Sequence, residues 1–434
     1  MESTQKEIIV KGGGTNSKTL TKVMFISASA SLILFISLFL LYILTSGYLF
    51  SDFAETLSYC ISRNPYSGVD NIHSIYPPFA FLPFYLFALI CKTPLQNYLN
   101  GELTLPELVK EPSYILSFLL FYIICLAIVL FLASKISKFK GIKLVCLWII
   151  IATSAPFIYC FYRGNNIISA CIFGMLFFWL YKSDKKWQRE IANLCLACAV
   201  AIKIYPIILI IFFLKDRRFL DMLKTVLYSL ILLFIPFLLI DGGFSNIKLI
   251  WRNFKKFNSG EGRDMDWANI SLDSLASKIS MLFGSKALHG ILSKLFRFGA
   301  LITSIITLCL AKNSKKEMQT ILIALLTYEL FMGVSYAYTL TFLVYPLIMY
   351  FNNFDELSKL DKIYYGICFA FIGFSPFASF SFFLLTSISA VCLLIKSYVD
   401  IILEFKTNKK SKTTLETKSE NEIEKQQKVL TNAE

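Results

Sequence analysis

The sequence predicts an all-α membrane protein that crosses the bilayer about twelve times. Hydrophobic residues make up 56% and aromatic residues 16% of the 434 positions, which is too apolar for a soluble protein of this length. Apolar runs of about 20 residues recur along the chain, and each is long enough to cross a hydrocarbon core of about 30 Å. The runs are continuous rather than alternating, so they predict helices and exclude a transmembrane barrel.

The positions of the charges indicate which loops are cytoplasmic. The net charge is +14, and the lysines and arginines gather in short segments between apolar runs. This pattern is typical of cytoplasmic loops and not of a nucleic-acid-binding surface, so no nucleic-acid partner is expected. The four main basic clusters lie at 135–143, 182–189, 215–224 and 312–316.

The N-terminal part of the chain predicts a tail, an anchor and a long outer loop. Residues 1–23 are expected to be cytoplasmic, and 24–50 to cross outward as an uncleaved signal anchor. The first outer loop then spans 51–113 and includes an interfacial helix at 77–91, begun by two prolines that a helix start tolerates. The next crossings are expected at 114–133, 143–161 and 166–181.

The run 190–214 carries Lys203 and Pro206 near its middle. It is too short for two full crossings, so we expect two half-helices that meet at Lys203-Ile204-Tyr205-Pro206, as in membrane proteins whose broken helices line a cavity. A single tilted crossing is the alternative, and it would invert the topology of every later segment.

The remaining apolar runs complete a membrane domain over 24–396, with a second outer loop at 241–287 and a polar tail at 397–434 that is expected to be a disordered or frayed cytoplasmic helix. Basic residues at 248–256 fall on the outer side, against the usual charge bias, although a loop this long can translocate despite its charge. The later spans are expected at 225–240, 288–311, 319–337, 339–351, 363–376 and 378–396.

The cysteines do not predict a metal site. Most of the 11 lie inside apolar runs, and Cys195 and Cys198 form a single C-x-x-C without a second pair. Zinc and redox chemistry are therefore not expected, and buried, inert thiols are the better interpretation. We expect neither a metal nor another cofactor.

Two acids follow the first span directly. Asp52 and Glu55 lie one helical turn apart at the predicted outer surface, just before a proline-rich hairpin. A helix cap or a solvated face would explain them equally well. A hairpin folded over Asp52 would instead desolvate its carboxylate, which suits a general base that deprotonates an alcohol.

Two cations are predicted at the level of the outer leaflet. Arg163 ends one span in a tight turn with Asn165 and Asn166, and Lys203 lies inside an apolar run. An intramembrane cation normally has a partner or an anionic ligand, although a lysine can also extend to the interface. We expect Arg163 and Lys203 to reach the depth at which a lipid phosphate lies.

Motifs along most of the chain carry a family resemblance. In order they are Asp52-Phe53, Asn64-Pro65-Tyr66, Tyr76-Pro77-Pro78, Arg163-Gly164-Asn165-Asn166 and Lys203-Ile204-Tyr205-Pro206. Together they resemble glycosyltransferase family 87, a branch of the clan-C membrane glycosyltransferases that use polyprenyl-phosphate sugars and include α-mannosyltransferases. Asn165 stands where that family usually has glutamine.

Two later elements depart from the family pattern. Asn269-Ile270-Ser271-Leu272 resembles an Asn-Gln-Ser-Leu element, and Ser335-Tyr336-Ala337-Tyr338 lies where the family often has Ser-x-Trp with histidines. The chain has only two histidines, His73 and His289, and neither lies there. Tyr336 or Tyr338 would have to take over any role of the missing histidine.

The resemblance implies a clan-C architecture and sugar transfer on the outer face of the plasma (inner) membrane, facing the periplasm or exterior. A hexose such as mannose would pass, with inversion, from a polyprenyl-phosphate donor to a hydroxyl of a lipid or glycan acceptor, among membrane lipids. Asp52 would be the base, and Arg163 and Lys203 would bind the donor phosphate and stabilise its charge. The supporting residues would be Glu55, Tyr76, Asn165, Asn166, Asn269, Tyr336 and Tyr338.

Two other functions fit parts of the sequence. A flippase for polyprenyl-linked glycans, or a solute transporter, would explain the broken helix and the intramembrane cations, but not the acids of the first outer loop, and transporters usually contain internal repeats. A glycan polymerase or ligase is compatible with the long second outer loop, 241–287.

Overall fold

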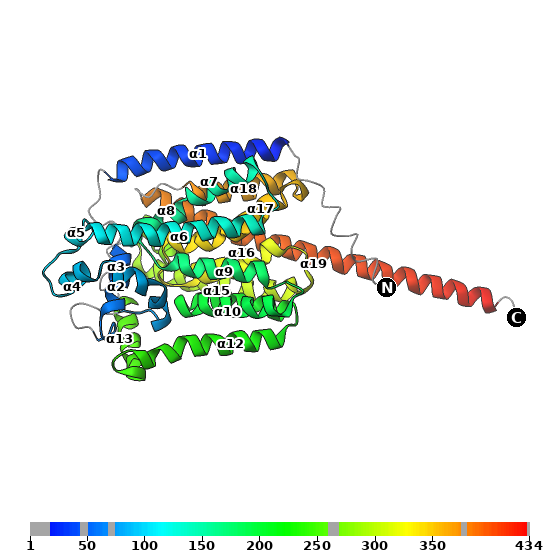
Figure 1. Cartoon of the computed structure of the whole chain (residues 1–434). Helices are drawn as coiled ribbons and strands as arrows, with labels where there is room; N and C mark the ends of the chain where they lie inside the picture. The colour runs from blue at the N-terminus through cyan, green and yellow to red at the C-terminus, as the bar shows by residue number, and fades with distance from the viewer. Residues whose placement is uncertain (1–17, 44–50, 68–73, 259–268, 375–379, 432–434) are drawn as a thin grey trace.

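The long helices of the computed structural model run side by side, as in a bundle that crosses a membrane (Figure 1). The structure describes residues 18–43, 51–67, 74–258, 269–374 and 380–431. These residues form α- and 3-10 helices and no strand, apart from one isolated bridge between Asn269 and Tyr336. The all-α prediction is therefore confirmed for the described part of the chain.

The helices of the first half lead from the first span to the break at Lys203. They are α1 (Lys18–Ile43), α2 (Ser51–Ile61), η2 (Pro78–Phe84), α3 (Tyr85–Ile90), α4 (Lys92–Leu99), α5 (Leu105–Leu108), α6 (Pro112–Ile136), α7 (Ile142–Ala152), α8 (Ala155–Arg163), α9 (Ile167–Leu180) and α10 (Lys186–Ile202).

The second half continues from that break to the C-terminal helix. Its helices are η3 (Tyr205–Ile210), α11 (Ile211–Lys215), α12 (Phe219–Phe234), η4 (Ile235–Leu239), η5 (Gly243–Ser245), α13 (Asn246–Asn258), α14 (Leu272–Leu282), α15 (Lys286–Leu310), η7 (Ala311–Asn313), α16 (Glu317–Phe331), η8 (Ala337–Leu343), α17 (Val344–Asn352), η9 (Phe354–Glu356), α18 (Lys359–Gly373) and α19 (Phe380–Thr431).

Four helices among the described residues are long and apolar enough to cross a membrane, namely Lys18–Ser37, Pro112–Ile136, Phe219–Leu239 and Ala287–Leu310. They correspond to predicted crossings. The number rises to six if two bent helix pairs each count as one span, and the count of about twelve stays a prediction.

The bent pairs show where the described helices depart from straight spans. The predicted crossing at 143–161 is divided into α7 and α8, which meet at 48°. Pro156 lies in the first turn of α8, where it has no N–H to continue the hydrogen-bond ladder of α7. The second pair, Pro78–Ile90 and Lys92–Leu99, turns by 106° in the region where the sequence predicts an interfacial helix.

The run 190–214 turns back on itself at Lys203, as the two predicted half-helices require. Helix α10 ends at Ile202, Lys203 is extended, and η3 and α11 return the chain to the end at which α10 began. The start of α12 lies beside the start of α10, where Lys224 pairs with Glu190 and Asn193 donates a 3.2 Å hydrogen bond to Asp221. The basic clusters 182–189 and 215–224 therefore share one end of the bundle.

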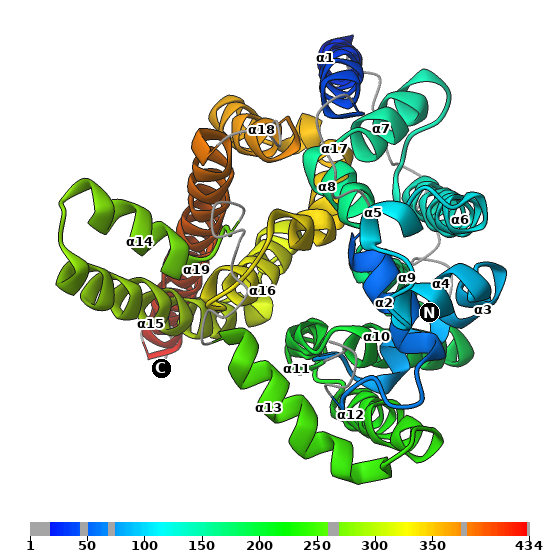
Figure 2. The ribbon, with the colours of Figure 1, turned by 90° about the vertical axis from the view of Figure 1, so that its left-hand side faces the viewer.

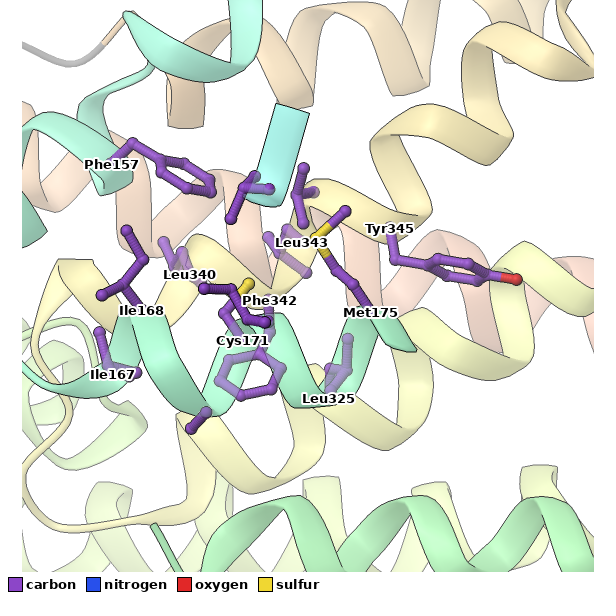
Figure 3. Packing of buried hydrophobic residues seen from close by; sticks show 14 of the residues in the cluster. Phe157, Ile167, Ile168, Cys171, Met175, Leu325, Leu340, Phe342, Leu343 and Tyr345 are labelled. Carbon is purple, nitrogen blue, oxygen red and sulfur yellow. The ribbon is translucent and has the colours of Figure 1, made fainter. Parts of the chain in front are cut away.

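Helix α9 lies at the centre of the packing. Figure 3 shows its side chains Cys171 and Met175 toward Leu343 and Phe342 of η8, and Ile168 toward Leu340 of the same helix. A stacked pair at 4.1 Å, Phe178 and Tyr345, extends the contact to α17. Since lipid is as apolar as these side chains, close packing rather than removal from water holds such helices together. This packing fixes η8, which follows a loop of the candidate site.

The two ends of the bundle differ. Helices α2 to α5 and α13 gather at one end, and the C-terminal part of α19 projects from the other (Figure 1). Helix α19 runs on to Thr431 through the segment for which the sequence predicts a disordered tail or a frayed helix. Inside the bundle, Lys396 of α19 pairs with Asp400 and, at 2.6 Å, with Asp361 of α18.

Candidate active site

Helix α2 places Asp52 in its first turn, where a carboxylate interacts favourably with the helix N-terminus. The next residue, Phe53, is fully buried and packs against four aromatic rings whose centroids lie 5.2 to 6.0 Å away. These are the rings of Phe84, Tyr114, Phe118 and Phe121. Phe53 therefore anchors α2, and Asp52 is held at a fixed place beside it.

The turn after α8 holds both oxygens of Asp52. Arg163 forms an ion pair with Oδ1, and the Asn165 side chain donates a 2.8 Å hydrogen bond to Oδ2. The Asn165 Oδ1 also accepts from the backbone N–H of Ile167 at 3.0 Å, so the turn is tied to the start of α9. Two residues that the sequence placed in separate roles are thus direct partners of the predicted base.

The contact between Arg163 and Asp52 could not be predicted from the sequence. Asp52 supplies Arg163 with an opposite charge. The two residues lie 111 positions apart in the sequence. A second contact between Arg163 and a donor phosphate stays a prediction.

Gly164 makes the close approach of this turn possible. It has a φ of +66°, and a Cβ there would lie 2.5 Å from the Cβ of Phe53. Glycine adopts that backbone conformation without strain, and its missing side chain lets the Arg163-Asn165 turn rest directly on α2.

We expect Gly164→Ala to lower the free energy of unfolding by on the order of 2 kcal/mol or more, because the backbone strain and the clash add. The turn could then no longer hold Asp52. Gly141→Ala is the matched control, since Gly141 also has a positive φ, +56°, but a Cβ at that position would meet nothing within 4 Å. Thermal unfolding in detergent measures the stability of both variants. Equal losses in the two variants would contradict the importance of the contact.

Lys203 reaches the same place from the break after α10. Its backbone is extended, with φ −138° and ψ 120°, and its Nζ lies 4.1 Å from the centre of the Tyr76 ring. A cation over an aromatic face is a favourable contact. Among the described residues no carboxylate forms an ion pair with Lys203.

Tyr76 connects the two halves of the site. Desolvation, followed by the nearby charges of Asp52 and Glu55, raises the pKa of Tyr76 above its ordinary value, while the charge of Arg163 acts in the opposite direction. The phenol therefore stays neutral. Because Lys203 lies over the ring of the same residue, the structure brings Lys203, Asp52 and Arg163 together around Tyr76.

Glu55 is exposed and accepts a hydrogen bond from the hydroxyl of Tyr59, one turn further along α2. Burial and then the charge of Glu55 raise the pKa of Tyr59. Glu55 thus lies one turn from Asp52, as predicted. Its hydrogen bond is to Tyr59, whereas Asp52 contacts Arg163 and Asn165.

Three predicted residues of the later loops, Tyr336, Tyr338 and Asn269, lie near the turn that contains Arg163. The ring of Tyr338 stacks at 5.6 Å on Tyr159 of α8, and Tyr336 packs against Tyr338 at the same distance. Asn269 holds their loop, since its side chain accepts from the N–H of Ser335 at 3.0 Å and donates to the carbonyl of Gly333 at 3.0 Å. The geometry gives Asn269 a structural role and leaves the two tyrosines facing the turn of Arg163.

Asn166 is 1% exposed, and neither polar atom of its side chain has a hydrogen-bond partner among the described residues. Buried carboxamides are normally satisfied, so this one has the capacity to bind a substrate hydroxyl or a water molecule.

Sequence reasoning did not single out Glu329 of α16. Its side chain is 1% exposed, and in the described part of the chain neither carboxyl oxygen has a partner; the same holds for the hydroxyls of Tyr205 and Thr341. The signal was present, because a single acid inside an apolar run is by default a functional candidate in a membrane protein.

The cysteines of the described residues are free thiols, Cys195 and Cys198 included. Across the described ranges, no group of three histidine, cysteine, aspartate or glutamate side chains could hold a metal ion.

Comparison with known families found a match. A model of glycosyltransferase family 87 matches residues 75–346, which is more than half of the chain. The match includes Tyr76, Arg163, Lys203 and the loops of Asn269 and Tyr336, whereas Asp52 precedes it. A search of curated proteins found no match.

Proposed function

The chain belongs to glycosyltransferase family 87, and from this premise we propose that it transfers a hexose such as mannose from a polyprenyl-phosphate donor to a hydroxyl of a lipid or glycan acceptor. The observation that supports this proposal best is the position of one carboxylate, Asp52, beside Arg163, Asn165 and the Tyr76–Lys203 pair. Membership of a glycosyltransferase family favours an enzyme over the flippase and transporter alternatives.

In the proposed mechanism, Asp52 accepts the proton of the acceptor hydroxyl as its oxygen attacks the anomeric carbon of the donor sugar. The bond between that carbon and the phosphate oxygen breaks, and the electron pair leaves with the lipid phosphate. A single displacement of this kind inverts the configuration. The partners of Asp52 support its role by holding the carboxylate in a fixed orientation, since Arg163 pairs with Oδ1 and Asn165 donates to Oδ2.

Lys203 is the cation that we assign to the departing phosphate. Among the described residues Lys203 forms no ion pair and lies over the Tyr76 ring, while the charges of Asp52 and Glu55 act on it from a greater distance. A phosphate would supply a direct ion-pair partner. Preorganised positive charge at the leaving group often contributes more to lowering the barrier of such a step than any other single effect. Arg163 orients Asp52, and its guanidinium with five N–H donors has the geometry to contact the same phosphate.

The direct test is transfer of labelled sugar in vitro from a polyprenyl-phosphate donor to a membrane lipid extract by the purified protein. Labelled product is expected with the polyprenyl-phosphate donor and not with a nucleotide sugar. Transfer from the nucleotide sugar alone would overturn the proposed donor.

We further propose that the site faces the periplasm or exterior of the plasma membrane. The supporting observation is that the Asp52 end of α2 and the basic clusters 182–189 and 215–224 lie at different ends of the bundle (Figure 1). Basic loops favour the cytoplasmic side.

Cysteine labelling on a Cys-less background tests this orientation. Ser67→Cys and Ser245→Cys should react with an impermeant maleimide in intact cells, whereas Lys185→Cys should react only after permeabilisation. The opposite pattern would place the site in the cytoplasm. Ser259, which belongs with Ser245 to the predicted second outer loop, 241–287, lies outside the described residues.

A further inference from the structure

Helix α13 lies across the end of the bundle. It follows the span Phe219–Leu239 after a short turn, and both views show it crossing the direction of α12 (Figures 1 and 2). The last residues of that span, Leu238 and Leu239, are 64% and 86% exposed. A span that ends at this level places α13 at the depth of the membrane interface.

One face of α13 is fixed to the protein. Asn246 and Asn253 are buried, and Leu249 and Ile250 pack near Tyr66. The Asn253 side chain donates to the carbonyls of Tyr66 and Ser74 at 3.3 and 3.1 Å. Helix α13 therefore holds the segment that leads to Tyr76.

The other two faces of α13 carry different chemistry. At 100° per residue, Ile247, Trp251 and Phe254 form one stripe. Ile247 and Trp251 are 40% and 59% exposed, and Trp251 stacks on Phe254 at 6.1 Å. The adjacent stripe is basic and exposed, and consists of Lys248, Arg252, Lys255 and Lys256.

We propose that α13 is an interfacial helix whose apolar stripe enters the bilayer and whose basic stripe binds the headgroups of anionic lipids on the active-site side. An apolar stripe with an aromatic residue beside a row of cations is the pattern of helices that lie in a membrane surface. The charges complement anionic phosphates, and the neighbouring span fixes the height. Headgroup contact also accounts for basic residues on a side where loops normally avoid them. The proposal does not depend on sugar transfer.

Tryptophan quenching in nanodiscs tests the proposal without a turnover assay. Brominated phosphatidylglycerol and brominated phosphatidylcholine are compared at equal mole fraction, and the signal of Trp251 is the quenching lost in Trp251→Phe. We expect roughly twofold stronger quenching of Trp251 by the anionic lipid, because basic residues enrich it locally. No difference between wild type and Trp251→Phe would show that Trp251 does not contact lipid, and would overturn the proposal.

Charge variants separate the headgroup contact from apolar insertion. Replacing Lys248, Arg252, Lys255 and Lys256 by Gln should abolish the preference for the anionic lipid and leave the quenching itself. The matched control replaces the same number of charges at the other end of the bundle, at Lys182, Lys185, Lys186 and Arg189, and should keep the preference. A preference that survives the α13 substitutions would overturn the headgroup assignment. Loss of the preference in inorganic phosphate, but not in sodium chloride of the same ionic strength, would show a site for free phosphate instead.

Discussion

Asp52→Asn is expected to abolish sugar transfer while the protein still folds and inserts. The substitution removes the proton acceptor but keeps a polar side chain of the same size beside Arg163 and Asn165. Loss of a general base typically lowers the rate about 10²- to 10⁴-fold. Initial rates with a polyprenyl-phosphate sugar measure the loss, and gel filtration with a thermal unfolding curve shows whether the fold is retained.

Glu55→Gln is the matched control for this prediction. Glu55 lies one turn from Asp52 on the same helix, and its described partner is Tyr59 rather than Arg163. Near-normal turnover is expected for Glu55→Gln. Turnover that survives Asp52→Asn but not Glu55→Gln would show that the base has been assigned to the wrong acid. Activity in both variants would rule out this mechanism.

The composition of the site could be predicted from the sequence because each component leaves a local signal. These components are an acid after the first span, a Gly-Asn turn between two apolar runs and a lysine two residues before a tyrosine-proline pair. The break after Ile202 follows from the same logic, since Pro206 cannot continue a helical ladder. In the structure these elements meet around Tyr76.

The pairing within the site could not be predicted in this way. Arg163 and Lys203 look alike in sequence, yet Arg163 has a carboxylate partner and Lys203 has an aromatic ring. This long-range pairing depends on how α8 packs on α2. Gly164 permits the packing, because a Cβ at that position would lie 2.5 Å from the Cβ of Phe53, and this requirement is visible only in the structure. Hydropathy alone also does not determine the number of spans. Helices such as α7 and α8 are short and meet at a bend, so the length of an apolar run does not show whether they cross the membrane as one span.

Lys203→Met is expected to lower kcat/KM for the donor by about 10²- to 10³-fold, the usual loss when one preorganised electrostatic contact to a developing charge is removed. Methionine is an unbranched apolar side chain close to lysine in length, and the substitution removes the ammonium group. Lys203→Arg should retain more activity, because it keeps a cation near Tyr76. The KM for the acceptor should change little in either variant, since the proposed contact is to the donor phosphate.

The thermal stability of these variants distinguishes a substrate contact from a structural one. An intramembrane ammonium without an ion-pair partner is costly, so its removal should leave the melting temperature unchanged or raise it. A structural cation would show the opposite result, with stability and activity falling together. Tyr76→Phe is the matched control, because it keeps the ring that Lys203 contacts at 4.1 Å and removes only the hydroxyl. Donor KM in this control should stay near the wild-type value, and an equal loss in Lys203→Met and Tyr76→Phe would indicate that the phenol rather than the ammonium binds the donor.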